Sequence, residues 1–292
     1  MKRFVTLGLM CLAMSVDIPS FADQKVKKTM FSFTENFDNA LELAQAHDMP
    51  LVLIFTAKDW CNFSQKLYDK ILMAPEFAEE VHKKFVFVTV DFKDEGVLQR
   101  EKLLEQHIAL KKRFAIQDFP QIVLLDPKGL EIAKLGYSEE IPMEYGKRLV
   151  SLWNKYRGLE KEIAVPKRLS FEKIKEIFIE AQEMGAPALL SQLIELGLKI
   201  DKDNFFLIEA YRHGDIETKK KLRDKIASVA LEEKEKTLVC CDLIDYSEAS
   251  GIEKEKILKE LREKIQSMKD KGLDISKMWT HIDGLLDQEL VR

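Results

Sequence analysis

The chain has 292 residues, enough for two domains, and 46% of them are apolar and 33% charged. This is the composition of an ordinary globular protein, and it excludes a disordered chain and a membrane-embedded one. The formal net charge of −4, without a basic stripe, argues against a nucleic-acid-binding protein.

The first 22 residues are predicted to be a targeting segment rather than part of the fold. Lys2 and Arg3 supply a positive start, residues 4–16 are largely apolar, and Ser20-Phe21-Ala22 offers a small-x-small cleavage site. The apolar stretch is too short to span a bilayer, which disfavours a membrane anchor. We therefore expect a signal peptide and an exported protein, periplasmic if the source is a bacterium, in a compartment that permits disulfides.

Strand and helix patterns alternate from about residue 30 to residue 156. Strands are expected where short apolar runs are bounded by turn residues, and helices where apolar residues recur at helical spacing. The expected strands cover 30–34, 50–55, 85–92, 121–126 and 131–136, and the expected helices cover 36–47, 65–72, a segment from residue 75, 94–113 and 145–156.

The pattern changes in the second half of the chain. Residues 157–169 are polar, contain a proline and are predicted to be a linker. From Ser170 onward no strand pattern is found, and breakers such as Gly185, Gly214 and Gly251 divide the segment into about seven short helices. Because no repeat of fixed period is present, a compact helical bundle is preferred over a solenoid.

Cys61 is placed by this pattern where a buried strand leads into the first turn of a helix. Unpaired backbone N–H groups and the positive end of the helix dipole favour a thiolate there. The alternative is an inert core cysteine, because free cysteine is among the most buried residue types. Removal of residues 1–22 leaves three cysteines, an odd number, so at least one is free or paired between molecules. The other two, Cys240 and Cys241, fall in an apolar helix and are interpreted as core thiols.

Two motifs accompany this position, the lead-in Phe55-Thr-Ala-Lys-Asp-Trp-Cys61 and the dipeptide Phe119-Pro120. The lead-in resembles that of the exported thioredoxin-superfamily proteins with a Trp-Cys-x-x-Cys site, and the dipeptide resembles that family's cis-proline dipeptide. Helix and strand segments over residues 39–50, 75–91 and 112–129 occur in the expected order, so the resemblance covers roughly residues 30–156.

This resemblance implies an α/β thioredoxin-like sandwich, and the pattern from Ser170 onward predicts that an all-α helical domain follows it. The predicted organisation is a signal peptide over 1–22, a thioredoxin-like domain over 23–156, a linker over 157–169 and the helical domain over 170–292. The resemblance also implies that the cis bond turns the Phe119 backbone toward Cys61, where it can pair with an extended substrate segment. A trans proline at a strand start is the alternative.

The family's second cysteine is replaced here by Ser64, so the site reads Cys-x-x-Ser. A hydroxyl cannot attack a mixed disulfide, although it can donate a hydrogen bond that stabilises the Cys61 thiolate. Lys58 is a further candidate for stabilising the thiolate by its charge, with a solvated loop lysine as an equally good interpretation.

The substrate-binding candidates are aromatic residues around the thiol and the proline of the loop. They are Trp60, Phe63, Phe119 and Pro120, and the three aromatic residues would form an apolar rim suited to unfolded chains. Each of the three could equally belong to the core.

The sequence thus predicts an exported protein of thiol-disulfide exchange, disulfide isomerase-like, with Cys61 as the single nucleophile. Its expected partners are cysteine-containing exported proteins and an external thiol such as glutathione or a redox partner, and homodimerisation stays open. No cofactor and no metal are expected, because the five histidines lack ligand spacing. The first alternative is a redox-weak chaperone or thiol-retention protein. A glutathione transferase is disfavoured, because the expected Glu-Ser pair does not follow Pro120.

Overall fold

The computed structural model describes residues 33–94, 101–166, 169–201, 204–228 and 234–272. Its first half is built on a five-stranded sheet with the strand order β1-β3-β2-β4-β5. The first three of these strands run parallel, and β4 and β5 are antiparallel to their neighbours. The strands are β1 (Phe33–Thr34), β2 (Leu51–Thr56), β3 (Val86–Asp91), β4 (Gln121–Leu125) and β5 (Glu131–Gly136).

Helices cover both faces of the sheet because successive side chains of a strand point to opposite faces. In the central strand β2, Val52 and Ile54 pack in one core cluster, and Leu51, Leu53 and Phe55 pack in another. The second cluster includes residues of α1 (Phe37–His47) and α4 (Glu101–Arg113). The first includes residues of a π-helical segment η1 (Leu67–Leu72), α3 (Pro75–Val81) and α5 (Pro142–Ile163). The predicted α/β sandwich is therefore confirmed.

The element that carries the candidate nucleophile is split in two. The predicted helix over 65–72 consists of a short α-helix, α2 (Asn62–Lys66), followed directly by η1. The helix predicted from residue 94 is described only from Glu101 onward, and the strand predicted over 30–34 only from Phe33 onward. The predicted signal peptide lies outside the described residues. Where the chain is described, no helix is long and apolar enough to cross a membrane.

The predicted linker over 157–169 is wrong in its first half, because α5 continues to Ile163. This end of α5 is polar in composition but has an apolar face, on which Tyr156, Leu159 and Ile163 are buried at helical spacing. These side chains belong to the same core cluster as Val52 of the sheet.

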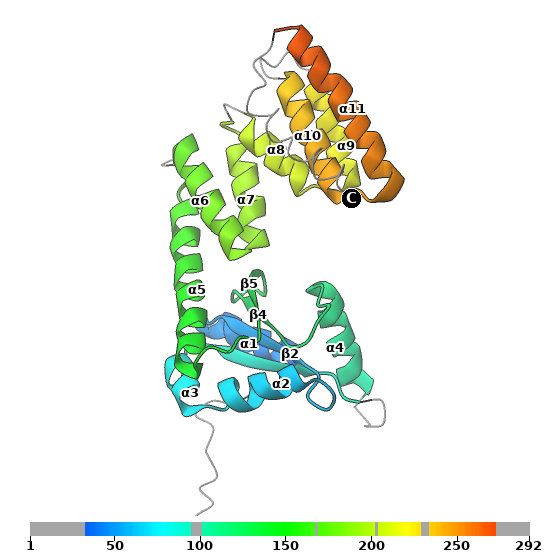
Figure 1. The fold of residues 1–292 in the computed structure, drawn as a ribbon. Helices are drawn as coiled ribbons and strands as arrows, with labels where there is room; N and C mark the ends of the chain where they lie inside the picture. Colours follow the sequence, from blue (N-terminus) through cyan, green and yellow to red (C-terminus); the bar gives the residue numbers. More distant parts are fainter. Residues whose placement is uncertain (1–32, 95–100, 167–168, 202–203, 229–233, 273–292) are drawn as a thin grey trace, which may run out of the picture.

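The core cluster also continues into the helices that follow. It takes in residues of α6 (Phe171–Met184), α7 (Pro187–Gly197) and Phe206 at the start of α8 (Phe205–Arg212). Figure 1 shows α5 extending away from the sheet toward α6, with the lower end of α7 above β5, and α7 contacts β5. The sheet and the first helices of the helical region therefore share one core.

The remaining helices form a group farther from the sheet (Figure 1). They are α8, α9 (Ile216–Ser228), α10 (Lys234–Glu248) and α11 (Gly251–Asp270), and they have two small core clusters of their own. The described part of the chain after residue 170 is helical, which confirms the predicted all-α character. This described part contains six helices, α6 to α11. The prediction of about seven extended to residue 292, beyond the described residues.

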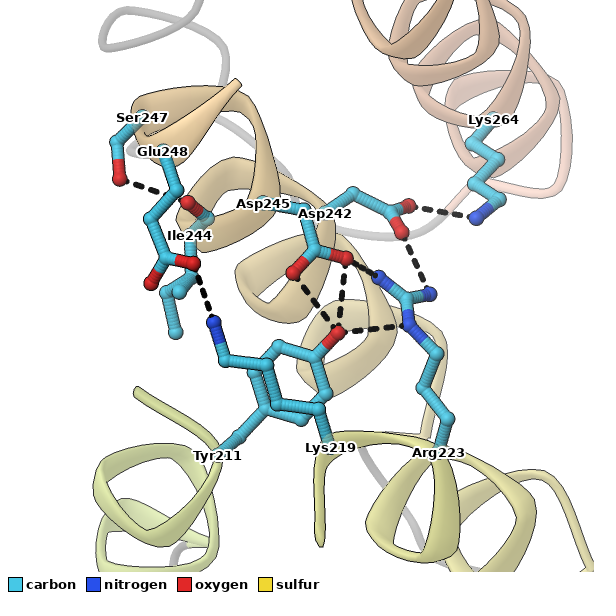
Figure 2. A network of polar contacts seen from close by, with 9 residues as sticks. All are labelled: Tyr211, Lys219, Arg223, Asp242, Ile244, Asp245, Ser247, Glu248 and Lys264. Atoms are coloured by element: carbon cyan, nitrogen blue, oxygen red, sulfur yellow. Dashed lines mark hydrogen bonds and ion pairs between the residues drawn. The ribbon is translucent and has the colours of Figure 1, made fainter. Parts of the chain in front are cut away.

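A polar network ties these distal helices together (Figure 2). Arg223 of α9 donates from Nε to the Tyr211 hydroxyl of α8 at 2.9 Å and pairs with two carboxylates of α10, Asp242 at 2.7 Å and Asp245 at 2.6 Å. Asp242 also accepts from Lys264 of α11 at 2.5 Å. Four helices thus meet in one set of charge-assisted contacts.

Candidate active site

Cys61 is the N-cap residue of α2, with φ −111° and ψ 109°. Its backbone N–H donates to the Ala57 carbonyl at 2.8 Å, and its own carbonyl accepts from the Gln65 N–H at 3.1 Å. The strand-to-helix position predicted for Cys61 is confirmed. The side chain is only partly buried and forms no disulfide, so Cys61 is not a core cysteine.

The surroundings of the sulfur favour the thiolate. Partial burial raises the pKa of the Cys61 thiol, but hydrogen bonds with the Ser64 hydroxyl and with the backbone N–H groups of Ser64 and Phe63 lower it, and the net pKa lies below its ordinary value. Since the thiolate is the nucleophilic form, the thiol is available for exchange at lower pH than a free cysteine.

Ser64 is fully buried and has a second role that the sequence does not indicate. Its Oγ accepts a hydrogen bond from the Ala57 N–H at 3.1 Å while its hydroxyl faces the Cys61 sulfur. One hydroxyl therefore links the strand end, the helix start and the thiol.

The Phe119–Pro120 peptide bond is cis, as predicted. The Phe119 carbonyl oxygen accepts from Cys61 Sγ at 3.5 Å, so this backbone does lie next to the sulfur. Its pairing with a substrate segment stays a prediction.

Aromatic side chains flank Cys61 in the sequence and pair with rings of the neighbouring elements. Trp60 is 55% exposed and Phe63 is 54% exposed, so neither belongs to the core. The Trp60 ring lies 5.7 Å from the Phe119 ring, and the Phe63 ring lies 5.9 Å from that of Tyr137. Tyr137 was not predicted. It follows Gly136, which pairs with Gln121 directly after the cis-proline, so only the strand register brings it to the site.

Lys58 is engaged elsewhere. Its ammonium lies 3.6 Å from Asp91 Oδ2 and 4.2 Å from the centre of the Tyr68 ring. It is not among the groups that lower the pKa of Cys61. The structure therefore gives Lys58 a carboxylate partner, and support of the thiolate falls to Ser64 and the helix start.

Asp91, at the end of β3, is an acid beside the site that sequence reasoning missed. It is buried, and its carboxylate accepts from the Thr56 hydroxyl at 2.7 Å and from Lys93 at 2.7 Å. Burial raises the pKa of Asp91, but these hydrogen bonds and that of the Lys58 backbone N–H lower it, and the net pKa lies below its ordinary value. The buried His107 side chain also hydrogen-bonds the Asp91 backbone.

The other two cysteines lie in α10 of the distal group. Cys241 is buried, and desolvation raises the pKa of its thiol to about 12, whereas Cys240 is half-buried. The reading as a core thiol is confirmed for Cys241. Among the described residues no cluster of His, Cys, Asp and Glu could hold a metal ion.

Comparison with known proteins finds a domain family whose model covers this site. The model of a thioredoxin-like domain matches residues 37–142. Residues 37–142 are a thioredoxin-like domain. The match contains the corner at Cys61, the Phe119–Pro120 bond and β5.

Two relatives from Chlamydia pneumoniae are similar to this chain. The thioredoxin-related protein DsbJ is 27% identical over 213 residues, which cover 73% of this chain and 60% of DsbJ. The disulfide bond reductase DsbH is 31% identical over 103 residues, which cover 35% of this chain and 61% of DsbH. The chain thus spans about three fifths of each relative. The DsbJ match extends beyond the thioredoxin-like domain, since it is longer than that domain.

Solved structures similar to this chain include the DsbH oxidoreductase, with 28% identity and a TM-score of 0.39 over 41% of this chain and 82% of that one. A thioredoxin from Thermus thermophilus has 21% identity and a TM-score of 0.34 over 43% of this chain and 89% of that one.

Proposed function

We propose that this chain is an exported thiol-disulfide exchange protein, disulfide isomerase-like, in which Cys61 is the single nucleophile. The observation that carries the proposal is the Cys61–Ser64 pair. The thiol has a lowered pKa and lies beside the Phe119 carbonyl, and a hydroxyl occupies the position from which a second thiol would act. The names of the relatives DsbJ and DsbH point to the same class of chemistry.

The reaction begins with attack of the Cys61 thiolate on one sulfur of a substrate disulfide. A mixed disulfide forms, the substrate S–S bond breaks, and the released sulfur leaves as a thiolate that takes a proton from water. Because Ser64 cannot attack this intermediate, a thiol of the substrate does so and expels Cys61. The substrate ends with a different pairing and no net change in oxidation state.

An external thiol supplies the second route. When one glutathione attacks the mixed disulfide and a second resolves the product, the substrate gains two thiols, and two glutathione molecules become one glutathione disulfide. Net reduction therefore consumes two external thiols for each disulfide. The expected substrates are exported proteins that contain cysteine.

The surroundings of the thiol suit a loosely folded chain. An extended segment can pair with the Phe119 backbone while its apolar side chains contact the exposed rings of Trp60 and Phe63. The same exposed rings support the second candidate, a chaperone or thiol-retention protein, which would bind unfolded chains without needing turnover at Cys61.

The proposal is tested by trapping the mixed disulfide. The chain is incubated with a disulfide-linked cysteine peptide and analysed by intact mass and peptide mapping. We expect one adduct, on Cys61, that persists until a thiol is added. In Ser64→Cys the adduct should be lost without added thiol, because a second sulfur can expel the peptide. Ser191→Cys, at an exposed position of α7, is the matched control and should keep the adduct on Cys61. The absence of an adduct on Cys61 would contradict the proposal.

A further inference from the structure

Asp91 is a buried carboxylate that contacts the loop leading to Cys61, through the backbone N–H of Lys58. It is the last residue of β3, it stands opposite Thr56 at the end of β2, and it is 6% exposed. A buried carboxylate is costly unless its oxygens are satisfied, so its contacts indicate what it does.

The two oxygens of Asp91 have different partners. Oδ1 accepts from the Thr56 hydroxyl at 2.7 Å and from the Lys58 backbone N–H at 3.2 Å. Oδ2 pairs with the Lys93 ammonium at 2.7 Å and with the Lys58 ammonium at 3.6 Å. Oδ1 therefore holds the loop, and Oδ2 is neutralised by two lysines.

The residue between the two contacts of Oδ1 is Ala57, and it contacts the site directly. Its carbonyl accepts from the Trp60 N–H at 3.2 Å and from the Cys61 N–H at 2.8 Å. Its own N–H donates to Ser64 Oγ at 3.1 Å, and Ser64 in turn supports the Cys61 sulfur.

We propose that Asp91 is a positioning residue for the Cys61 thiolate. Oδ1 binds the Thr56 hydroxyl and the Lys58 N–H, so it restrains the residues before and after Ala57. The Ala57 carbonyl then stays at the N–H of Cys61, and its N–H stays at the Ser64 hydroxyl. This inference rests on the proposed function in one respect, because it takes Cys61 to be the reactive thiol.

Asp91 does not serve as a proton carrier for the thiol in this account. The hydrogen bonds with Lys93, Thr56 and Lys58 keep its pKa below the ordinary value, so it stays ionised where a thiol exchanges. Its effect on Cys61 is transmitted by geometry, through two backbone hydrogen bonds of Ala57.

The test is the rate at which iodoacetamide alkylates Cys61 at pH 7 in the full chain, with the modified cysteine identified by peptide mapping. Asp91→Ala should slow alkylation about two- to fivefold, because one hydrogen bond to the thiolate is weakened and a more basic thiolate partly compensates. Asp91→Asn keeps the Oδ1 acceptor and should restore a rate within about twofold of the parent chain.

The matched control is Asp126→Ala. Asp126, in the β4–β5 turn, is also a buried acid, 1% exposed. Its carboxylate accepts from the N–H groups of Lys128 and Leu130 in that turn and from the Tyr156 hydroxyl of α5. Its loss costs a comparable set of hydrogen bonds, but the alkylation rate should not change. Thr56→Val serves as a second variant in case Asp91→Ala does not fold. It removes one donor to Oδ1 and should also slow alkylation of Cys61.

A parent-like rate in both Asp91→Ala and Thr56→Val would overturn the inference, and so would equal slowing by Asp126→Ala. Slowing by Asp91→Asn as large as that by Asp91→Ala would also overturn it, because the ion pairs would then be responsible. Alkylation needs no disulfide substrate, so these results stay readable even if no mixed disulfide forms at Cys61.

Discussion

At the scale of single residues, one buried hydroxyl and the N–H groups of the helix start support the Cys61 thiolate. Ser64 supports the sulfur and accepts from Ala57, so it replaces a resolving thiol with a fixed hydrogen-bond donor. In the function proposed here, the Cys61 thiolate forms the mixed disulfide and an incoming thiol resolves it, because a hydroxyl cannot.

Replacing this hydroxyl should change the pH dependence of the thiol. The pKa of Cys61 is lowered by the Ser64 hydroxyl and by N–H groups of the helix start, so the reactive thiolate is present above that lowered pKa and is lost as the pH falls through it. In Ser64→Ala the midpoint of the alkylation rate against pH should move to higher pH, with about two- to fivefold slower alkylation at pH 7.

Ser191→Ala, which removes a hydroxyl bonded only to the Pro187 carbonyl of its own helix, is the control and should keep the parent profile. An unchanged midpoint in Ser64→Ala would show that the helix start alone stabilises the thiolate.

The sequence predicted those site residues whose position depends on local structure. Cys61 and Ser64 follow an apolar strand within one motif, and Phe119–Pro120 is a dipeptide with its own signature. Asp91 and Tyr137 reach the site only through strand register. Asp91 stands opposite Thr56, and Tyr137 follows Gly136, the partner of Gln121; register cannot be read from one segment.

At the scale of elements, α7 and α8 pack closely against each other at Gly197 and Phe206. A Cβ on Gly197, the last residue of α7, would lie 2.2 Å from atoms of the Phe206 ring. That ring is fully buried and packs edge-to-face against Phe171 and Phe178, so it cannot move aside without disturbing the shared core.

Gly197→Ala should therefore lower the free energy of unfolding by about 1–3 kcal/mol through overpacking. Gly158→Ala is the matched control, because Gly158 lies in α5 with open space around its Cβ position. It should raise the free energy of unfolding by roughly 0.5–1 kcal/mol through helix propensity. Denaturant titration of both variants measures the difference, and equal effects would contradict the packing argument.

The elements themselves were predicted well where apolar pattern and turn residues agreed, as in β2 and α1. The end of α5 was missed because Leu159 and Ile163 are separated by charged residues, which gave the segment a linker-like composition. The π-helical turn of η1 was missed because no residue pattern distinguishes it from a continued α-helix.

At the scale of the whole molecule, the hydrophobic core continues past the predicted linker and separates into smaller clusters only within the helical region. One core cluster runs from β2 through α5 to α6 and α7, whereas α9, α10 and α11 pack in smaller clusters. Long-range packing of this kind cannot be derived from composition. Composition indicates only where the chain changes from alternating strands and helices to helices alone.

Hydrogen exchange under native conditions should reflect this division. Amides of α6 and α7 should exchange through the same opening reaction as those of β2 and β4, because a shared core opens cooperatively. Amides of α9 and α11 should exchange through a separate opening of lower free energy. Loss of protection in α6 and α7 while the sheet stays fully protected would contradict a shared core.

The central claim, that the molecule exchanges disulfides through Cys61 alone, is tested most directly by refolding of a scrambled disulfide protein in a glutathione buffer. The chain without residues 1–22 is compared with its Cys61→Ala and Cys240→Ala variants. The account predicts that the parent and Cys240→Ala accelerate recovery of the native pairing, whereas Cys61→Ala does not exceed the buffer alone. Equal acceleration by the parent and Cys61→Ala, or none by either, would contradict it and leave the chaperone as the better function.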